Sequence, residues 1–200
     1  MKMTVTTLCL IAFAMAAHPA AALAGDREGF YLGFGGGWGS AKVESDQGSS
    51  TDRESSGVGY IKAGGTLNRH LLFGGELNAW RKTATIDTNT EATLKMYNLA
   101  ATLTYYPGAT NGFFIKGGAG VALLGSEFTV PGAKLQLDMG NGLGVIAGLG
   151  YDIPLGGNVS ITPALNVWRG DIGDLTVGSQ TRFTNWTQNV VDLTIGIVFH

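Results

Sequence analysis

The feature that most constrains this chain of 200 residues is an alternation of apolar and polar residues with a period of two. Side chains along a β-strand point alternately to opposite faces of the sheet, so the pattern predicts strands whose two faces differ in character. After the first two dozen residues no segment keeps the period of about 3.6 that a helix requires. Eight segments carry the alternation, and we expect a strand over each: roughly 29–42, 58–68, 71–84, 92–106, 113–130, 134–151, 159–169 and 188–199.

The connections between these segments alternate between short and long. Three are short and rich in turn-forming residues, at 68–70, 107–112 and 152–158. The others are longer or polar (43–57, 85–91 and 170–187), except that the fifth and sixth segments meet at 131–133. Transmembrane barrels have short turns on the periplasmic side and longer loops outside. The pattern predicts an all-β fold, an eight-stranded antiparallel up-and-down transmembrane β-barrel with both termini on the periplasmic side.

The two faces of the predicted strands differ sharply. One face carries large apolar side chains, as at Phe30, Leu32 and Phe34 of the first segment, while the other carries glycine and polar groups. Glycine accounts for 32 residues, more than twice the usual share of roughly 7%, and glycine within strands suits a tightly curved sheet. A soluble barrel turns its apolar face inward, whereas a membrane barrel turns it toward lipid.

The placement of aromatic residues favours the membrane arrangement. Five aromatic residues fall at strand ends on the short-turn side, and three tryptophans fall near the loop ends. Two such rings match the girdles at the two membrane interfaces. The residues are Phe30, Tyr105, Phe113, Tyr151 and Phe199 on the first side and Trp38, Trp80 and Trp168 on the second. The alternative is a periplasmic lipocalin-like barrel with aromatic residues at its rims.

The first 24 residues predict a cleaved export signal. An apolar run at 8–17 follows a basic residue, and Ala22 and Ala24 occupy the small-residue positions that precede a cleavage site. The apolar run is shorter than the ~20 residues that a membrane-spanning helix needs. Cleavage after Ala24 would leave a barrel domain of residues 25–200 that starts at Gly25.

Four charged residues lie near the middle of their strands on the polar face: Lys62, Glu76, Lys116 and Asp192. If the second hairpin turns about Arg69, Lys62 lies directly opposite Glu76. A lone charge inside a barrel carries a desolvation cost of several kcal/mol, which pairing can offset. We therefore expect a closed network that packs the lumen, and the alternative is a gate or a proton path.

The sequence presents no catalytic, cofactor-binding or metal-binding constellation. His70 and His200 are far apart in the sequence, and neither stands near a serine or an acid in a catalytic arrangement. The glycine runs at 33–37 and 142–144 lack the strand-to-helix transition of a phosphate-binding loop. A net charge of −2 without a run of Lys or Arg gives no reason to expect a nucleic-acid partner. We expect a protein that is not an enzyme and has no cofactor.

The last strand carries a family resemblance. Its apolar residues alternate toward one face and end on an aromatic residue, at Val191, Leu193, Ile195, Ile197 and Phe199. This pattern resembles the C-terminal signal by which outer-membrane barrels are recognised for assembly, although such chains usually stop at the aromatic residue and here His200 follows. Together with the start GFYLGFGGGWG and the eight-strand pattern, residues 25–200 resemble the small outer-membrane β-barrel family that includes the OmpA barrel and OmpX.

The resemblance implies a protein of the Gram-negative outer membrane. Its implied partners are outer-membrane lipid, lipopolysaccharide and the barrel assembly machinery, with further surface partners at the outer loops. The implied role is a structural or surface-interaction scaffold. The alternative is a narrow conduit for small hydrophobic molecules, as the OmpW-like relatives are thought to be.

Overall fold

The computed structural model describes residues 29–45, 52–87, 90–108, 111–130, 133–177 and 180–200. The predicted export signal and its cleavage site between Ala24 and Gly25 lie outside these ranges. Within them no helix is long and apolar enough to cross a membrane.

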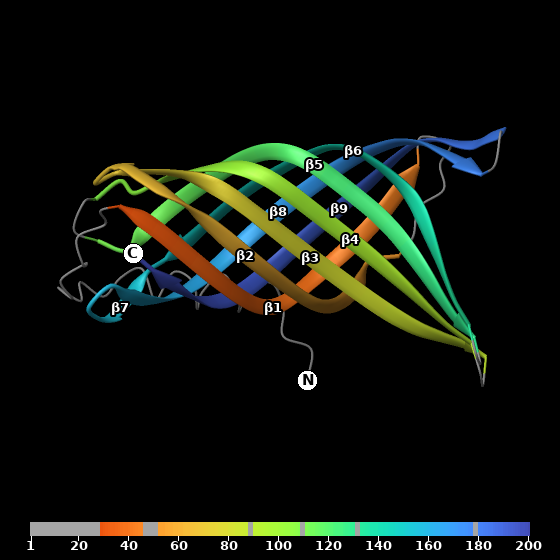
Figure 1. Ribbon diagram of the computed structural model, residues 1–200, viewed down its shortest axis with the longest axis horizontal. Helices are drawn as coiled ribbons and strands as arrows, with labels where there is room; N and C mark the ends of the chain where they lie inside the picture. Colours follow the sequence, from red (N-terminus) through yellow and green to blue (C-terminus); the bar gives the residue numbers. More distant parts are fainter. Residues whose placement is uncertain (1–28, 46–51, 88–89, 109–110, 131–132, 178–179) are drawn as a thin grey trace.

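The described chain forms one antiparallel sheet that closes on itself (Figure 1). Strands that follow one another in the sequence pair with each other, except β6 and β7, which both pair with β8, and β9 pairs with β1. Closure is completed between β6 and β8, from Leu143 opposite Asp171 to Gly150 opposite Ala164. The strands are β1 (Phe30–Ser45), β2 (Glu54–Asn68), β3 (Leu71–Asp87), β4 (Thr90–Tyr105), β5 (Phe113–Val130), β6 (Ala133–Tyr151), β7 (Ile153–Gly156), β8 (Val159–Val177) and β9 (Gln180–Phe199).

The short strand β7 continues β6 beyond Asp152, and both pair with β8. Together β6 and β7 therefore form one of eight walls, and the predicted eight-stranded antiparallel barrel is confirmed. The three short turns lie at one end of the barrel. At the opposite end, several strands extend well beyond the closed part of the barrel.

Two predicted loops are wrong in the structure. The segment 85–91 belongs mostly to β3 and β4, and 170–187 belongs mostly to β8 and β9. The sequence suggested loops because the outward apolar residues stop there. Above the membrane an outward side chain meets water, so the apolar alternation ends although the backbone pairing continues.

The outward face of the barrel is apolar. Leu143 and Ile195 are 65% and 63% exposed, and every long strand has large apolar side chains that are exposed. The residues of the C-terminal signal, Val191 to Phe199 in alternation, also point outward. Because the apolar face is outside, the membrane arrangement is confirmed and the soluble lipocalin-like alternative is wrong.

The aromatic prediction is correct at one end and partly wrong at the other. The five aromatic residues of the short-turn end are exposed or partly exposed, and Trp38 is 66% exposed near the opposite end. Trp80 and Trp168, however, are almost fully buried inside the barrel. Trp80 and Trp168 each follow an inward residue, Asn78 and Asn166 respectively, by two positions along the strand. Strand alternation therefore turns both indoles inward, although the residues lie near the loops.

Candidate functional site

A buried ion pair occupies the middle of the lumen. Lys116 on β5 reaches past β4 to Glu76 on β3, with 2.5 Å between Nζ and Oε1. The side chains are 5% and 1% exposed, and Asn78 Nδ2 donates to the same carboxylate oxygen at 3.1 Å. All four predicted lumen charges are buried in the structure, and Lys62 lies opposite Glu76 in the register that the hairpin about Arg69 predicts.

The expected ion pair between Lys62 and Glu76 is wrong despite the correct register. The Lys62 ammonium lies over the ring of Phe114, 5.4 Å from its centroid. A desolvated ammonium gains from the negative face of an aromatic ring. Glu76 therefore pairs with Lys116 instead of Lys62. The Lys116 ammonium also lies 5.8 Å from the centroid of the Tyr60 ring.

Asp192 is held by neutral donors at the other side of the lumen. Asn166 Nδ2 donates to Oδ1 at 2.7 Å, and the Trp168 indole donates to Oδ2 at 2.9 Å. The predicted single network is therefore two groups, one built on Glu76 and Lys116 and one on Asp192.

A third buried carboxylate, that of Asp152, which was predicted to lie in a turn, is found toward the short-turn end. Asp152 accepts hydrogen bonds from the Tyr106 hydroxyl and the Thr162 hydroxyl, each at 2.6 Å. His200 Nε2 is 3.8 Å from the same carboxylate, and the His200 ring packs near Tyr31. The sequence did contain a signal for the inward position of Asp152, because this residue continues the series of alternate, inward-facing positions of β6. His200, which departs from the usual terminal aromatic, folds inward here.

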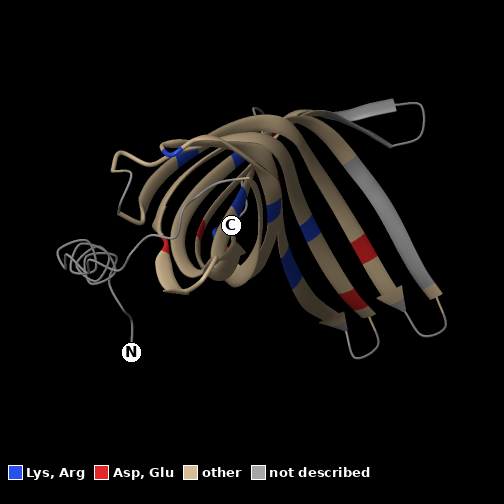
Figure 2. Ribbon diagram, turned by 60° about the vertical axis from the view of Figure 1, so that its left-hand side comes forward, with Lys and Arg blue, Asp and Glu red and all other residues tan. Residues whose placement is uncertain are grey.

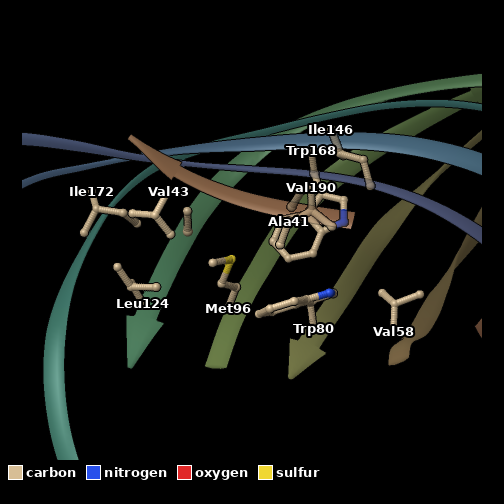
Figure 3. Close-up of a cluster of buried hydrophobic side chains, with 12 residues drawn as sticks. Ala41, Val43, Val58, Trp80, Met96, Leu124, Ile146, Trp168, Ile172 and Val190 are labelled. Atoms are coloured by element: carbon tan, nitrogen blue, oxygen red, sulfur yellow. The ribbon is translucent and has the colours of Figure 1, made fainter. Parts of the chain in front are cut away.

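An apolar layer fills the lumen toward the outer end (Figure 3). The indoles of Trp80 and Trp168 lie close to each other in this layer, and Trp80 Nε1 donates to the Gly39 carbonyl at 3.1 Å. The alternation predicted only glycine and polar groups inside the barrel, and the apolar layer shows that this prediction is wrong toward the outer end. The buried members, which we call the apolar plug, are Ala41, Val43, Val58, Trp80, Met96, Ala100, Ala122, Leu124, Ile146, Trp168, Ile172 and Val190.

At the level of the plug, one contact joins opposite walls and another joins the two walls that flank β6. Gln188 on β9 is fully buried, and its side-chain amide donates to the Tyr97 carbonyl on β4 at 3.1 Å. A Cβ added to Gly170 on β8 would lie 2.3 Å from the Cβ of Ala122 on β5. Strands β5 and β8 flank β6, so this close approach follows the tight curve of the wall around β6, and a side chain at position 170 would force the two strands apart.

The barrel splits into two arms beyond the plug (Figure 1). We call the ends of β3, β4, β5 and β6, residues 81–95 and 125–142, the β3–β6 arm. The hairpin of β8 and β9 beyond Asp171 forms the β8–β9 arm. Pairing between β6 and β8 ends at Leu143 and Asp171, and Gly142 still lies against the β8 backbone, so in the described chain β6 has a strand neighbour only on its β5 side from Ala133 to Asn141.

The described residues contain no group of three or more His, Cys, Asp or Glu residues that could hold a metal ion. The geometry provides a packed interior and two protruding arms with open strand edges. The interior has three layers: the Asp152 group, the charged groups of Glu76 and Asp192, and the apolar plug.

Comparison with known families decides where this barrel belongs. The family model described as "Outer membrane protein beta-barrel domain" matches residues 6–197. The chain belongs to this family. It is an outer-membrane β-barrel protein of a Gram-negative bacterium. No curated protein sequence matches it.

Solved structures support the same fold. Ail, the attachment invasion locus protein of Yersinia pestis, was solved in complex with the heparin analogue sucrose octasulfate. It aligns with a TM-score of 0.58 at 16% identity, over 86% of this chain and 99% of Ail. Neisserial surface protein A aligns with a TM-score of 0.56 at 20% identity, over 86% of this chain and 97% of that protein. At these identities the likeness concerns the fold alone.

Proposed function

We propose that this family member is a non-enzymatic scaffold that binds partners at the cell surface through its outer arms. The observation that carries the proposal is the open edge of β6 from Ala133 to Asn141. An unpaired edge offers a row of backbone donors and acceptors to an extended segment of another protein. Soluble proteins cover or interrupt such edges, so an edge kept open at the outer end favours a binding role.

The packed lumen supports the same conclusion. The plug, the hydrogen bond from Gln188 to Tyr97 across the lumen, and the ion pair of Glu76 with Lys116 fill the interior. An eight-stranded barrel has an interior just wide enough for its side chains. Conduction of small hydrophobic molecules would need these groups to move apart, so we place the function in the arms.

The test removes the β3–β6 arm and keeps the barrel. Residues 83–93 and 126–137 are each replaced by Asn-Gly, because Lys82 pairs with Leu94 and Gly125 pairs with Asp138 in the register. A matched variant shortens the β8–β9 arm between Gly173 and Trp186, which also pair. Bacteria that carry each variant are tested for binding to cultured epithelial cells and to immobilised heparin, the latter chosen because Ail binds a heparin analogue.

We expect shortening of the β3–β6 arm to abolish binding, and shortening of the β8–β9 arm to leave it largely intact. Uptake of small hydrophobic compounds should be the same in all variants. Unchanged binding in the first variant, together with altered uptake when Trp80 or Trp168 is replaced by alanine, would refute the scaffold and favour the conduit.

A further inference from the structure

The β3–β6 arm has a second open edge, on β3. Pairing of β3 with β2 ends at Trp80, whereas β3 continues to Asp87 beside β4. Just past Trp80, the Ser56 hydroxyl of β2 donates a hydrogen bond to the Arg81 carbonyl at 2.5 Å. Residues 83–86 are all exposed, so within the described chain no strand covers β3 on this side.

The hydrogen bond to Arg81 shows which backbone groups of β3 face the open side. The Arg81 carbonyl accepts from β2, so it points away from β4. Alternate residues of an antiparallel strand direct their N–H and C=O groups to the same side, so those of Thr83 and Thr85 also face the open side. Residues 83–86 contain no proline and no charge, and Ile86 is 62% exposed. Native edges are commonly blunted by proline or charge, and this stretch has neither device.

The two edges of the arm run in opposite directions. The arm is an open sheet of four antiparallel strands that lie side by side beyond the barrel (Figure 2). Strand β3 runs away from the short turns, and β6 runs toward them. A membrane gives every copy of the protein the same orientation. When two copies lie side by side, β6 of one copy and β3 of its neighbour are therefore antiparallel.

The two edges also meet at the same height above the membrane. The β3–β4 and β5–β6 hairpins end at about the same level (Figure 1). The strands of a barrel share one tilt to the barrel axis, so rotation of the neighbour about the membrane normal brings its β3 edge alongside β6. Direction, height and tilt are thus all compatible with pairing between copies.

We propose that a second copy of this chain binds at the arm, with its β3 edge paired to the β6 edge of the first copy. The inference rests on the proposed function, because it uses the same open edge of β6, residues 133–141. The β3 edge is the shorter one, so the contact is limited to residues 83–87 of the neighbour. The membrane has already fixed the orientation of both copies, which lowers the entropic cost of so small a contact.

The contact joins two different edges and can therefore repeat from copy to copy. Such a head-to-tail interface forms a row, or a ring if the rotation closes. In a row, the last copy keeps its β6 edge free for a partner from outside. Pairing between two β6 edges is a different arrangement. In one membrane the two β6 strands would run in the same direction, and antiparallel pairing would need copies that face each other from two membranes.

Engineered cysteines can distinguish these arrangements. The single cysteine of the chain, Cys9, lies in the predicted export signal. The register of the arm places Gln136 on β6 in the same outward row as Thr83 on β3. These two positions stand on opposite edges of the arm, so a disulfide between them has to join two copies. We expect Gln136 of one copy to lie beside Thr83 or Thr85 of the next.

The experiment oxidises intact outer membranes with copper phenanthroline and separates the products on denaturing gels. Gln136→Cys is compared alone and combined with Thr83→Cys or Thr85→Cys. The matched control combines Gln136→Cys with Glu91→Cys, an exposed position opposite Thr85 on β4. Glu91 lies one strand inside the edge, roughly 10 Å from a strand paired to β3 and too far for a disulfide. Altered migration of unboiled, unoxidised samples confirms that every variant is folded.

We expect at least one of the two edge combinations to give a ladder of dimers, trimers and larger products, and the single variant and the control to stay monomeric. Addition of Thr83→Pro to the combination of Gln136→Cys with Thr85→Cys should lower the cross-linked fraction by about fivefold. Proline removes an N–H that faces the open side and leaves the pairing with β4 intact. An unchanged ladder in the proline variant would overturn the proposal.

Two other results would also overturn it. Cross-linking of both edge combinations at the level of the Glu91 control would show that the edges do not meet. Equally strong dimers from Gln136→Cys alone would show that two β6 edges pair instead. Failure of the proposed function is a separate result: binding to epithelial cells and heparin that survives shortening of the β3–β6 arm would refute the scaffold, whereas the cross-link ladder would still establish the contact between copies.

Discussion

The buried pair of Glu76 and Lys116 allows a quantitative test of how the lumen is built. Glu76→Ala would leave the Lys116 ammonium desolvated and would also remove the hydrogen bond from Asn78. Breaking a buried ion pair by removal of one partner costs about 3–5 kcal/mol of folding free energy. Because both side chains are at most 5% exposed, we expect the cost of Glu76→Ala to fall in this range.

Two double-mutant cycles distinguish the actual partner of Glu76 from the residue that lies opposite it. One cycle combines Glu76→Ala with Lys116→Ala, and the other combines it with Lys62→Ala. We expect a coupling energy of about 2–3 kcal/mol for Lys116, the upper part of the range for contacting residues. The coupling with Lys62 should be below about 1 kcal/mol, because its ammonium lies over the Phe114 ring and not on the carboxylate.

The free energies come from urea unfolding of the protein in lipid vesicles, followed by tryptophan fluorescence. Reversibility in both directions has to be established for each variant, since the cycle assumes equilibrium values. A larger coupling with Lys62 than with Lys116 would refute the assigned pair. Single costs and couplings that are all near zero would refute the burial itself and would indicate that water reaches the lumen.

Three further predictions concern the closed barrel, the wall contact and the plug, and one concerns export. The protein should migrate differently in gels before and after boiling, because a closed barrel has no free edge within the membrane from which unfolding can start; identical bands would argue against closure. Gly170→Ala should lower the urea midpoint by the equivalent of about 1–3 kcal/mol, as for other overpacked sites, while Gly75→Ala, where an added Cβ has nothing within 4 Å, should have little effect. Trp168→Phe should cost about 1–3 kcal/mol because Asp192 loses a buried donor, and a cost near zero would mean that water replaces the indole. Intact mass of the membrane-extracted protein should place the mature N-terminus at Gly25, and a retained Met1 would refute cleavage.

The inward and outward positions could be predicted from the sequence because they depend on parity alone. Counting from the turn about Arg69 places Lys62 opposite Glu76, and the structure has this register. The partner of Glu76 could not be predicted in the same way. Lys116 reaches it from two strands away because the wall curves, and that approach depends on the cross-section of the barrel. A pattern along one strand carries no information about that cross-section.

The apolar plug illustrates a different limit. Trp80 and Trp168 have inward parity, yet their nearness to the loops made an interfacial girdle the more natural interpretation. The aromatic girdle and the plug place the same residue type at nearly the same height, on opposite faces of one wall. Parity decides between them, and a strict count from the middle of each strand would have placed both indoles inside.

The length of the outer arms was underestimated for a reason that also bears on function. Apolar alternation identifies a strand only where one face meets lipid, so the predicted strands at 71–84, 159–169 and 188–199 fell short at their outer ends, whereas those at 113–130 and 134–151 have about the observed length. Beyond that edge the backbone pairing of β8 and β9 continues to Val177 and Gln180. Strand pairing beyond the apolar band is not required to cross the membrane. The barrel below is already closed by the pairing of β1 with β9 and of β6 with β8. The extra strand length is therefore not explained by anchoring or by closure. The polar outward faces and open edges that it adds suit a binding surface in water, which is why the function that we propose lies in the arms.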